Sequence, residues 1–285
     1  MKKVLSPRWM LIISMAIFGT LGPFVRNIAV TSGELALYRA VLALVVIGAS
    51  LFLTKQDMSF QKIKKELPFL LASGVAMGFN WILLFEAYKY TTVSVATLSY
   101  YFAPVIVIVV CPILFKEKLT RKQLICFVMS TLGLVLITGI GNIGNGKDII
   151  GIGFGLGAAV LYATVILTNK FIKNVEGLQR TFWQFVSAIL VLIPYVLLTS
   201  GITLGGLNTF GWINLLIVGF IHTGLTYCMY FSSLKELPGQ KAAILSYIDP
   251  LVAVLISVTV LGESMTLWQM AGGILIMGFT LWNEI

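Results

Sequence analysis

Three ionisable side chains lie deep inside apolar runs of this sequence. Asp249 and His222 are near the middle of their runs, and Arg39 lies about two helical turns into its own. A charge in hydrocarbon costs ~2.5 kcal/mol or more, so such groups usually face a cavity or a partner. Asp249 could therefore hold a cationic substrate or exchange a coupling proton, and Arg39 could hold an anionic substrate group.

Each of these residues also has a purely structural interpretation, which the sequence leaves open. Pro250 frees a backbone carbonyl close to Asp249, and local hydrogen bonding there could satisfy the carboxylate. Arg39 could form a fixed ion pair, although Glu34, five residues earlier, falls on another face of a helix. His222 could be a neutral imidazole bonded to a neighbouring helix.

Polar and aromatic residues recur around these groups at helical spacing. Thr226 and Tyr230 follow His222 on one helix face, and Ser246 shares a face with Asp249. We expect them to line a substrate site together with residues from matching positions elsewhere in the chain. The full set of substrate-binding candidates is Asp249, His222, Asn80, Tyr100, Tyr101, Thr226, Tyr230, Ser246 and Arg39.

Other reactive patterns in the sequence favour structure over chemistry. The cysteines lie singly inside apolar runs, so neither a disulfide nor a metal site is expected. The run Gly153–Ala158 matches a loose dinucleotide fingerprint but lacks the strand that it requires. Close helix packing is the better interpretation for the glycines over 151–157, and the same role is expected for Gly74 and Gly78. Glu117 and Glu263 end equivalent helices, which favours an interface role. We expect no catalytic residue and no cofactor.

The amino-acid composition indicates that a lipid bilayer surrounds these candidate residues. Hydrophobic residues make up 58% of the chain and charged ones 11%, and apolar stretches long enough to cross a bilayer recur throughout. In hydrocarbon the backbone must be satisfied within each stretch, which predicts helices. The predicted spans are 9–30, 33–53, 67–88, 91–115, 121–140, 149–169, 178–199, 209–233, 239–261 and 266–284.

The basic residues give this chain an orientation. With the N-terminus in the cytoplasm, sixteen of the 20 Lys and Arg residues fall in cytoplasmic loops, as the positive-inside rule requires. The predicted location is the cell membrane, with both termini cytoplasmic. The net charge of +9 does not indicate a nucleic-acid partner, because no continuous basic stripe could follow phosphates.

The two halves of the sequence repeat at a shift of 146 residues. Tyr101 then aligns with Tyr247 and Pro104 with Pro250. Each half holds five predicted spans, an odd number, so the second half must be inverted in the membrane. The predicted fold is an all-α polytopic membrane protein with ten transmembrane helices, arranged as two inverted five-helix repeats over 1–140 and 149–285. The prolines should mark equivalent helix breaks.

The segment LSYIDPLVAVLISVTVLGESMTLWQMAGGILIMG (245–278) and its counterpart YYFAPVIVIVVCPILFKEKLTRKQ (100–123) resemble the closing helices of an EamA domain. Similarity to the EamA family of the drug/metabolite transporter superfamily covers nearly the whole chain as two tandem domains. The first copy departs from the pattern at Lys116 and Phe127, where the second has Gly262 and Gly273. The resemblance implies ten spans, a central cavity and transport of small metabolites, often outward.

The leading interpretation is a secondary-active transporter, in which the two halves rock around a site near the middle of the membrane. The resemblance favours amino acids, amines or organic cations as cargo and export as direction, and the position of Asp249 inside its span could allow proton coupling. The expected partners are a small-molecule substrate and membrane lipid. A metabolite importer of the same fold, an integral-membrane enzyme and a sensor are the alternatives; the enzyme is disfavoured by a single histidine and scattered acids.

The orientation can be tested by labelling single cysteines in intact cells, in a background without the native cysteines. Cysteines replacing Lys62 and Lys118 should resist an impermeant maleimide, and those replacing Gly144, Asn208 and Ser264 should react. Ready labelling at position 62 together with protection at position 144 would refute the ten-span assignment.

Overall fold

The computed structural model describes residues 5–25, 27–53, 60–91, 96, 99–138, 146–175, 177–262 and 266–284, and these form helices and their connections without a strand. The helices are α1 (Pro7–Gly19), α2 (Leu21–Val25), α3 (Ser32–Leu53), α4 (Phe60–Tyr90), α6 (Ala103–Phe115), α7 (Arg121–Thr138), α8 (Gly146–Phe171), α9 (Gly177–Thr199), η1 (Leu204–Gly206), α10 (Thr209–Ile217), η2 (Val218–Leu225), α11 (Thr226–Glu236), α12 (Gly239–Leu245), α13 (Ile248–Leu261) and α14 (Leu267–Glu284). Here η1 is a 3₁₀ turn and η2 is a π-helix.

Long apolar helices dominate this part of the chain. Within the described residues, 6 helical stretches are long and apolar enough to cross a membrane, and three shorter apolar helices accompany them. Each of the ten predicted segments contains a helix. The chain is therefore a multi-pass helical membrane protein, whereas the count of ten spans remains a prediction.

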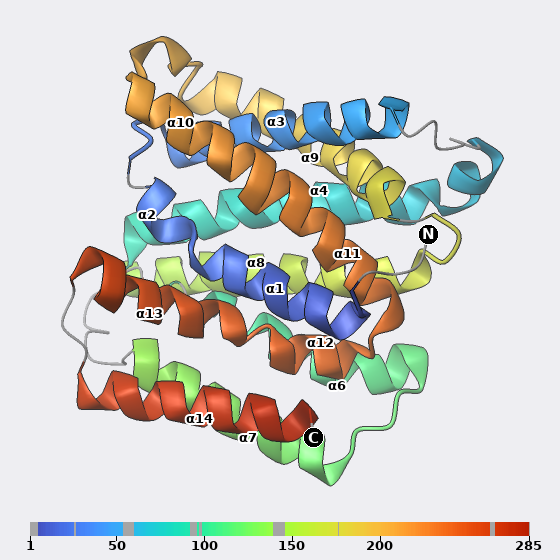
Figure 1. Cartoon of the computed structure of the whole chain (residues 1–285), viewed down its shortest axis with the longest axis vertical. Helices are drawn as coiled ribbons and strands as arrows, with labels where there is room; N and C mark the ends of the chain where they lie inside the picture. The colour runs from blue at the N-terminus through green and yellow to red at the C-terminus, as the bar shows by residue number, and fades with distance from the viewer. Residues whose placement is uncertain are drawn as a thin grey trace.

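The helices lie side by side and alternate in direction along the chain (Figure 1). The start of α1 and the end of α14 lie on the same side, at the right of the view, with the ends of α6 and α8. The starts of α3 and α8 and the ends of α4 and α9 lie on the other side. We call these sides the Glu117 end and the Glu34 end, because each of those glutamates anchors contacts there.

Several predicted spans are broken helices. The first does not run unbroken over 9–30, because α1 ends at Gly19 and the Thr20 hydroxyl donates to the Ile17 carbonyl over 2.7 Å. The predicted proline breaks are present: the helix is interrupted at 101–102, just before Pro104, and at 246–247, just before Pro250. Since a proline cannot donate its amide, the preceding turn loses a helical hydrogen bond at each site.

Two groups of helices pack against each other in the core. In the Trp81 bundle, α8 packs against α4 and α6, and α9 packs against α4. In the Arg39 bundle, α1 packs against α11 and α13, and η2 packs against α3. Contacts of α3 with α9 and of α6 with α12 join the bundles, while α7 and α14 pack together. Each bundle thus combines helices from both halves of the sequence.

Glycines allow the closest helix approaches in the Trp81 bundle. A Cβ on Gly74 would lie 2.2 Å from the Gln184 carbonyl oxygen of α9, and one on Gly155 would lie 2.7 Å from the Ser99 Cβ. The predicted packing role therefore holds for these two positions. It does not hold for Gly153, because a Cβ there would meet nothing within 4 Å.

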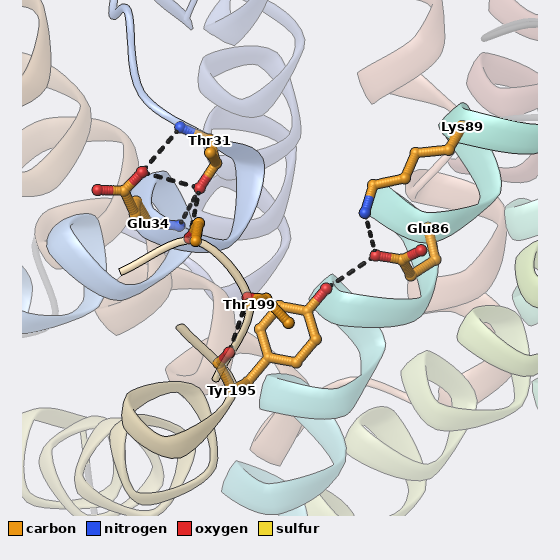
Figure 2. A network of polar contacts seen from close by, with 7 residues as sticks. Thr31, Glu34, Glu86, Lys89, Tyr195 and Thr199 are labelled. Carbon is orange, nitrogen blue, oxygen red and sulfur yellow. Dashed lines mark hydrogen bonds and ion pairs between the residues drawn. The ribbon is translucent and has the colours of Figure 1, made fainter. Parts of the chain in front are cut away.

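At the Glu34 end, one carboxylate ties α3 to the segment that follows α9. Glu34 accepts from the Thr203 amide at 2.6 Å, from the Thr31 amide at 3.1 Å and from the Tyr38 hydroxyl at 2.7 Å. Figure 2 shows Glu34 and Thr31 of this cluster beside a second one, in which the Tyr195 hydroxyl of α9 donates to Glu86 of α4. The start of α3 thus meets the end of α9, so the two helices are antiparallel.

At the Glu117 end, one carboxylate links α6, α8 and α12. Glu117 pairs with Lys170 of α8 and accepts from the Gly239 amide at the start of α12, at 3.0 Å. Lys170 also donates to the Leu237 carbonyl at 3.2 Å. The interface role expected for Glu117 is therefore present; its repeat mate Glu263 lies outside the described residues.

Candidate functional site

Four residues from four helices meet at the centre of the bundle. The Arg39 guanidinium of α3 lies over the Trp81 ring of α4, with 4.4 Å to the ring centroid. Phe185 of α9 packs against Trp81 and against Tyr227 of α11, at centroid distances of 6.2 and 5.4 Å. The Tyr227 hydroxyl lies beside Arg39. We call these residues the central quartet.

The central quartet follows the internal repeat. Arg39 and Phe185 are 146 residues apart, and so are Trp81 and Tyr227. Equivalent positions of the two halves therefore face one another across one point, although their chemistry differs. A guanidinium in one half stands where the other half has a phenyl ring.

Asp249 lies in the first turn of α13, directly after the break at 246–247. Its Oδ2 accepts from the Tyr101 hydroxyl at 2.7 Å. Tyr101 lies in the equivalent break before α6. The two breaks thus bring the Tyr101 and Asp249 side chains together where the two bundles meet. A Cβ on Gly19 would lie 2.6 Å from the Asp249 carbonyl oxygen, so α1 also closes on this point.

A chain of aromatic rings connects Asp249 with the central quartet. Tyr100, next to Tyr101, stacks on Tyr162 of α8 with 5.3 Å between centroids. Tyr162 accepts from the Tyr230 hydroxyl at 3.0 Å, and Tyr230 lies 6.1 Å from Tyr227. Such surfaces bind apolar and aromatic groups well and offer hydroxyls for orientation.

His222 is bonded to a neighbouring element, as its structural interpretation expected. Its Nε2 lies 3.0 Å from the Thr20 hydroxyl, in the link between α1 and α2. Because the Thr20 hydrogen is already donated to the Ile17 carbonyl, we assign the imidazole hydrogen to Nε2. Nδ1 is then an acceptor, buried and without a hydrogen-bond partner. Phe24 covers the ring at 4.8 Å.

Three of the predicted polar candidates use their side chains within the helix packing. Asn80 donates to the Ala158 carbonyl of α8 at 2.7 Å. The Thr226 hydroxyl donates to the Ile221 carbonyl of its own helix, and the Ser246 hydroxyl donates to the Ala242 carbonyl. A substrate role for these residues remains a prediction. The structure brings together Asp249, Tyr100, Tyr101, Tyr230 and, through Tyr227, Arg39.

The sequence interpretation missed four aromatic members of this region: Phe18, Tyr162, Phe185 and Tyr227. Trp81 was left without an assignment. A signal existed, because the same shift of 146 residues that pairs the prolines also pairs Trp81 with Tyr227 and Arg39 with Phe185. Within the described ranges, no group of three or more His, Cys, Asp or Glu residues could hold a metal ion.

Known transporter proteins match this chain over most of its length. The family model of the EamA-like transporter family matches residues 6–139 and again 149–283. The uncharacterized transporter YxxF of Bacillus subtilis is 30% identical over 268 residues, covering 93% of this chain and 85% of the relative. A protein of Salmonella typhimurium named "probable amino-acid metabolite efflux pump" is 27% identical over 229 residues, covering 75% of each chain.

A solved structure shares the fold. A crystal structure superposes with a TM-score of 0.85 at 15% identity, and the match covers 97% of this chain and 96% of that one. At this identity the similarity concerns the fold alone.

The bond between Tyr101 and Asp249 can be tested against its repeat mate. Tyr101→Phe removes the donor to a partly buried carboxylate, so we expect a loss of about 1.5–3 kcal/mol of stability. Tyr247→Phe removes a bond of 2.8 Å to the neutral Thr131 hydroxyl, so about 0.5–1.5 kcal/mol should be lost. Thermal unfolding of both variants in one detergent measures the difference. An equal or larger loss in Tyr247→Phe would contradict the assignment.

Proposed function

The chain belongs to the EamA-like transporter family, and from this we propose that it is a secondary-active transporter that moves small metabolites by alternating access. Amino acids, amines and organic cations are the favoured cargo, and export is the favoured direction. The observation that carries the proposal is the partly buried Asp249–Tyr101 pair, set among aromatic rings where the two bundles meet. The name of the Salmonella relative supports efflux.

We propose that the moving units are the Trp81 bundle and the Arg39 bundle rather than the two sequential halves. The predicted rocking of halves would separate α4 from α8 and α9. Those helices are held by Gly74 against Gln184, by Ser73 bonded to Gln184 at 2.7 Å, and by Asn80 bonded to Ala158. Breaking so many buried polar contacts in each cycle would be costly.

The inverted repeat supports the same division. Packing of α4 on α8 in one bundle has its counterpart in packing of α11 on α1 in the other, at a shift of 146 residues. The antiparallel contact of α3 with α9 relates each helix to its own repeat mate. Two bundles of similar construction and opposite orientation can exchange inward and outward conformations by one rocking motion.

The substrate site then lies on the plane that opens. Tyr101 and Trp81 belong to the Trp81 bundle side, while Asp249 and Arg39 belong to the Arg39 bundle. Each of the interactions described between them crosses from one bundle to the other. A substrate that replaces these contacts can therefore bias the relative position of the bundles, as coupling requires.

Asp249 is proposed as the charged group that binds the substrate or the coupling proton. Replacing Asp249 with Asn keeps the shape of the side chain but removes the charge. We expect Asp249→Asn to fold with near wild-type thermal stability and to lose transport, or its dependence on pH, in liposomes that exchange a labelled metabolite mixture. A folded variant with the wild-type rate, affinity and pH profile would show that the carboxylate is structural. Wild-type protein that exchanges no solute would oppose the proposed function itself.

The motion between bundles can be tested with a native cysteine. A Cβ on Gly239 of α12 would lie 3.6 Å from the Cys111 Cβ of α6, within the range of disulfides. We expect oxidised Gly239→Cys protein to lose transport and reduced protein to recover it, because the disulfide joins the bundles at the Glu117 end.

Gly239→Ser is the control, since it adds similar bulk without a thiol. Its transport should be equal with and without oxidant. Full transport by the oxidised Gly239→Cys protein, with the disulfide verified by mass spectrometry, would refute movement at this contact.

A further inference from the structure

Arg39 carries a charge that the described part of the protein does not neutralise. The residue is 8% exposed, and its Nε has no hydrogen-bond partner. The face of Trp81 covers the guanidinium. A cation against an aromatic ring gains some energy, but a ring satisfies none of the N–H donors.

Two carboxylates that could have paired with Arg39 accept hydrogen bonds from other residues. Glu34, the expected partner by sequence, accepts from Thr31, Tyr38 and Thr203 instead. Asp249 accepts from Tyr101. Among the described residues no carboxylate forms an ion pair with Arg39. The fixed ion pair that was one interpretation of Arg39 is therefore not found there.

A second buried arginine shows how this chain satisfies a guanidinium with a structural role. Arg180 is fully buried, and it donates to four backbone carbonyls at distances between 2.6 and 3.4 Å: those of Asn169, Ile172, Val175 and Phe231. In the part of the chain that the structure describes, Arg39 has no such set of backbone acceptors: the Tyr227 hydroxyl lies beside it, and its Nε has no partner. A buried guanidinium with a free donor indicates a place for an acceptor that arrives with the substrate.

We propose that Arg39 is the recognition residue for a carboxylate on the substrate. This deepens the proposed function and rests on it. The Asp249 carboxylate can accept more hydrogen bonds than the one from Tyr101, so it can also bind an ammonium group. The site would therefore select zwitterions that carry both an ammonium and a carboxylate group. Tyr227 lies beside Arg39, and the chain of aromatic rings described above leads from Tyr227 to Asp249.

The rings around these charges indicate the remainder of the substrate. Trp81, Phe185, Tyr227 and Phe18 form connected aromatic contacts, with Phe18 and Tyr227 at 5.0 Å between centroids. Apolar surface of this kind favours an aromatic or aliphatic side chain. The substrate class is thus an apolar α-amino acid or a zwitterion of similar size.

Three matched probes separate the charges of such a substrate: phenylalanine carries both, 2-phenylethylamine lacks the carboxylate, and 3-phenylpropanoate lacks the ammonium. Their affinities are measured by calorimetry on purified wild-type protein, Arg39→Gln and Arg39→Lys. Wild-type protein should bind phenylalanine most tightly. Arg39→Gln should weaken the affinity for phenylalanine by about 10- to 100-fold and leave the affinity for 2-phenylethylamine unchanged. Arg39→Lys should lose less of the affinity for phenylalanine than Arg39→Gln does, because lysine keeps the positive charge although it lacks the planar guanidinium.

Stability without ligand distinguishes recognition from structural support. Removing an uncompensated buried charge should leave the unfolding temperature of Arg39→Gln equal to or above that of wild type. A structural arginine would lower it. Arg121→Gln, which removes an exposed charge at the start of α7, is the matched control and should change neither affinity nor stability.

The inference is overturned if Arg39→Gln keeps the wild-type ratio of phenylalanine to 2-phenylethylamine affinity, if it unfolds at a clearly lower temperature, or if wild-type protein binds none of the probes. Exchange of a labelled metabolite mixture in liposomes separates these failures from failure of the proposed function. If exchange persists while the probes fail, transport stands and the carboxylate assignment falls. If exchange is absent as well, the proposed function falls.

Discussion

A polar group inside hydrocarbon has no water to bind, so the chain itself must supply each hydrogen-bond partner. The packing of α4 on α8 and α9 follows this constraint. Ser73 accepts from Gln184 and from Asn169, whose side-chain oxygen accepts from Gln184 in turn. Such a network fixes the rotation of three helices at once, because turning any of them would leave a buried amide without a partner.

The same constraint holds the connection between α8 and α9 in place. Glu66 of α4 accepts from the amides of Lys173, Asn174 and Val175, while Arg180 donates to carbonyls of the same stretch. The loop thus has its donors satisfied by one charged side chain and its acceptors by another. Among the described residues, the Arg39 Nε and the His222 Nδ1 are two of the seven buried side-chain atoms that lack a hydrogen-bond partner.

The sequence predicted what depends on local chemistry and on the bilayer. The apolar segments, the two proline breaks and the partly buried position of Asp249 all follow from residue type and spacing. The sequence could not predict which helices form each bundle. The packing partner of a helix depends on close contacts such as that of Gly74 with Gln184 and on hydrogen bonds such as that between Ser73 and Gln184. Asn80 and Thr226 were predicted as site residues from helix periodicity alone. Periodicity assigns a face, but it does not say whether that face meets the substrate region or a neighbouring helix.

One pair of equivalent positions bears on how the chain enters the membrane. Glu34 and Arg180 are 146 residues apart, near the starts of α3 and α9, and those starts lie at opposite ends of the bundle. Under the predicted orientation Arg180 is near the cytoplasm and Glu34 near the outside. The duplicated halves have therefore acquired opposite charges at one structural position. Cytoplasmic arginines retain a helix end on the cytoplasmic side during insertion. Under the predicted orientation, the second half would therefore carry its own sidedness signal and would not need to inherit it from the first.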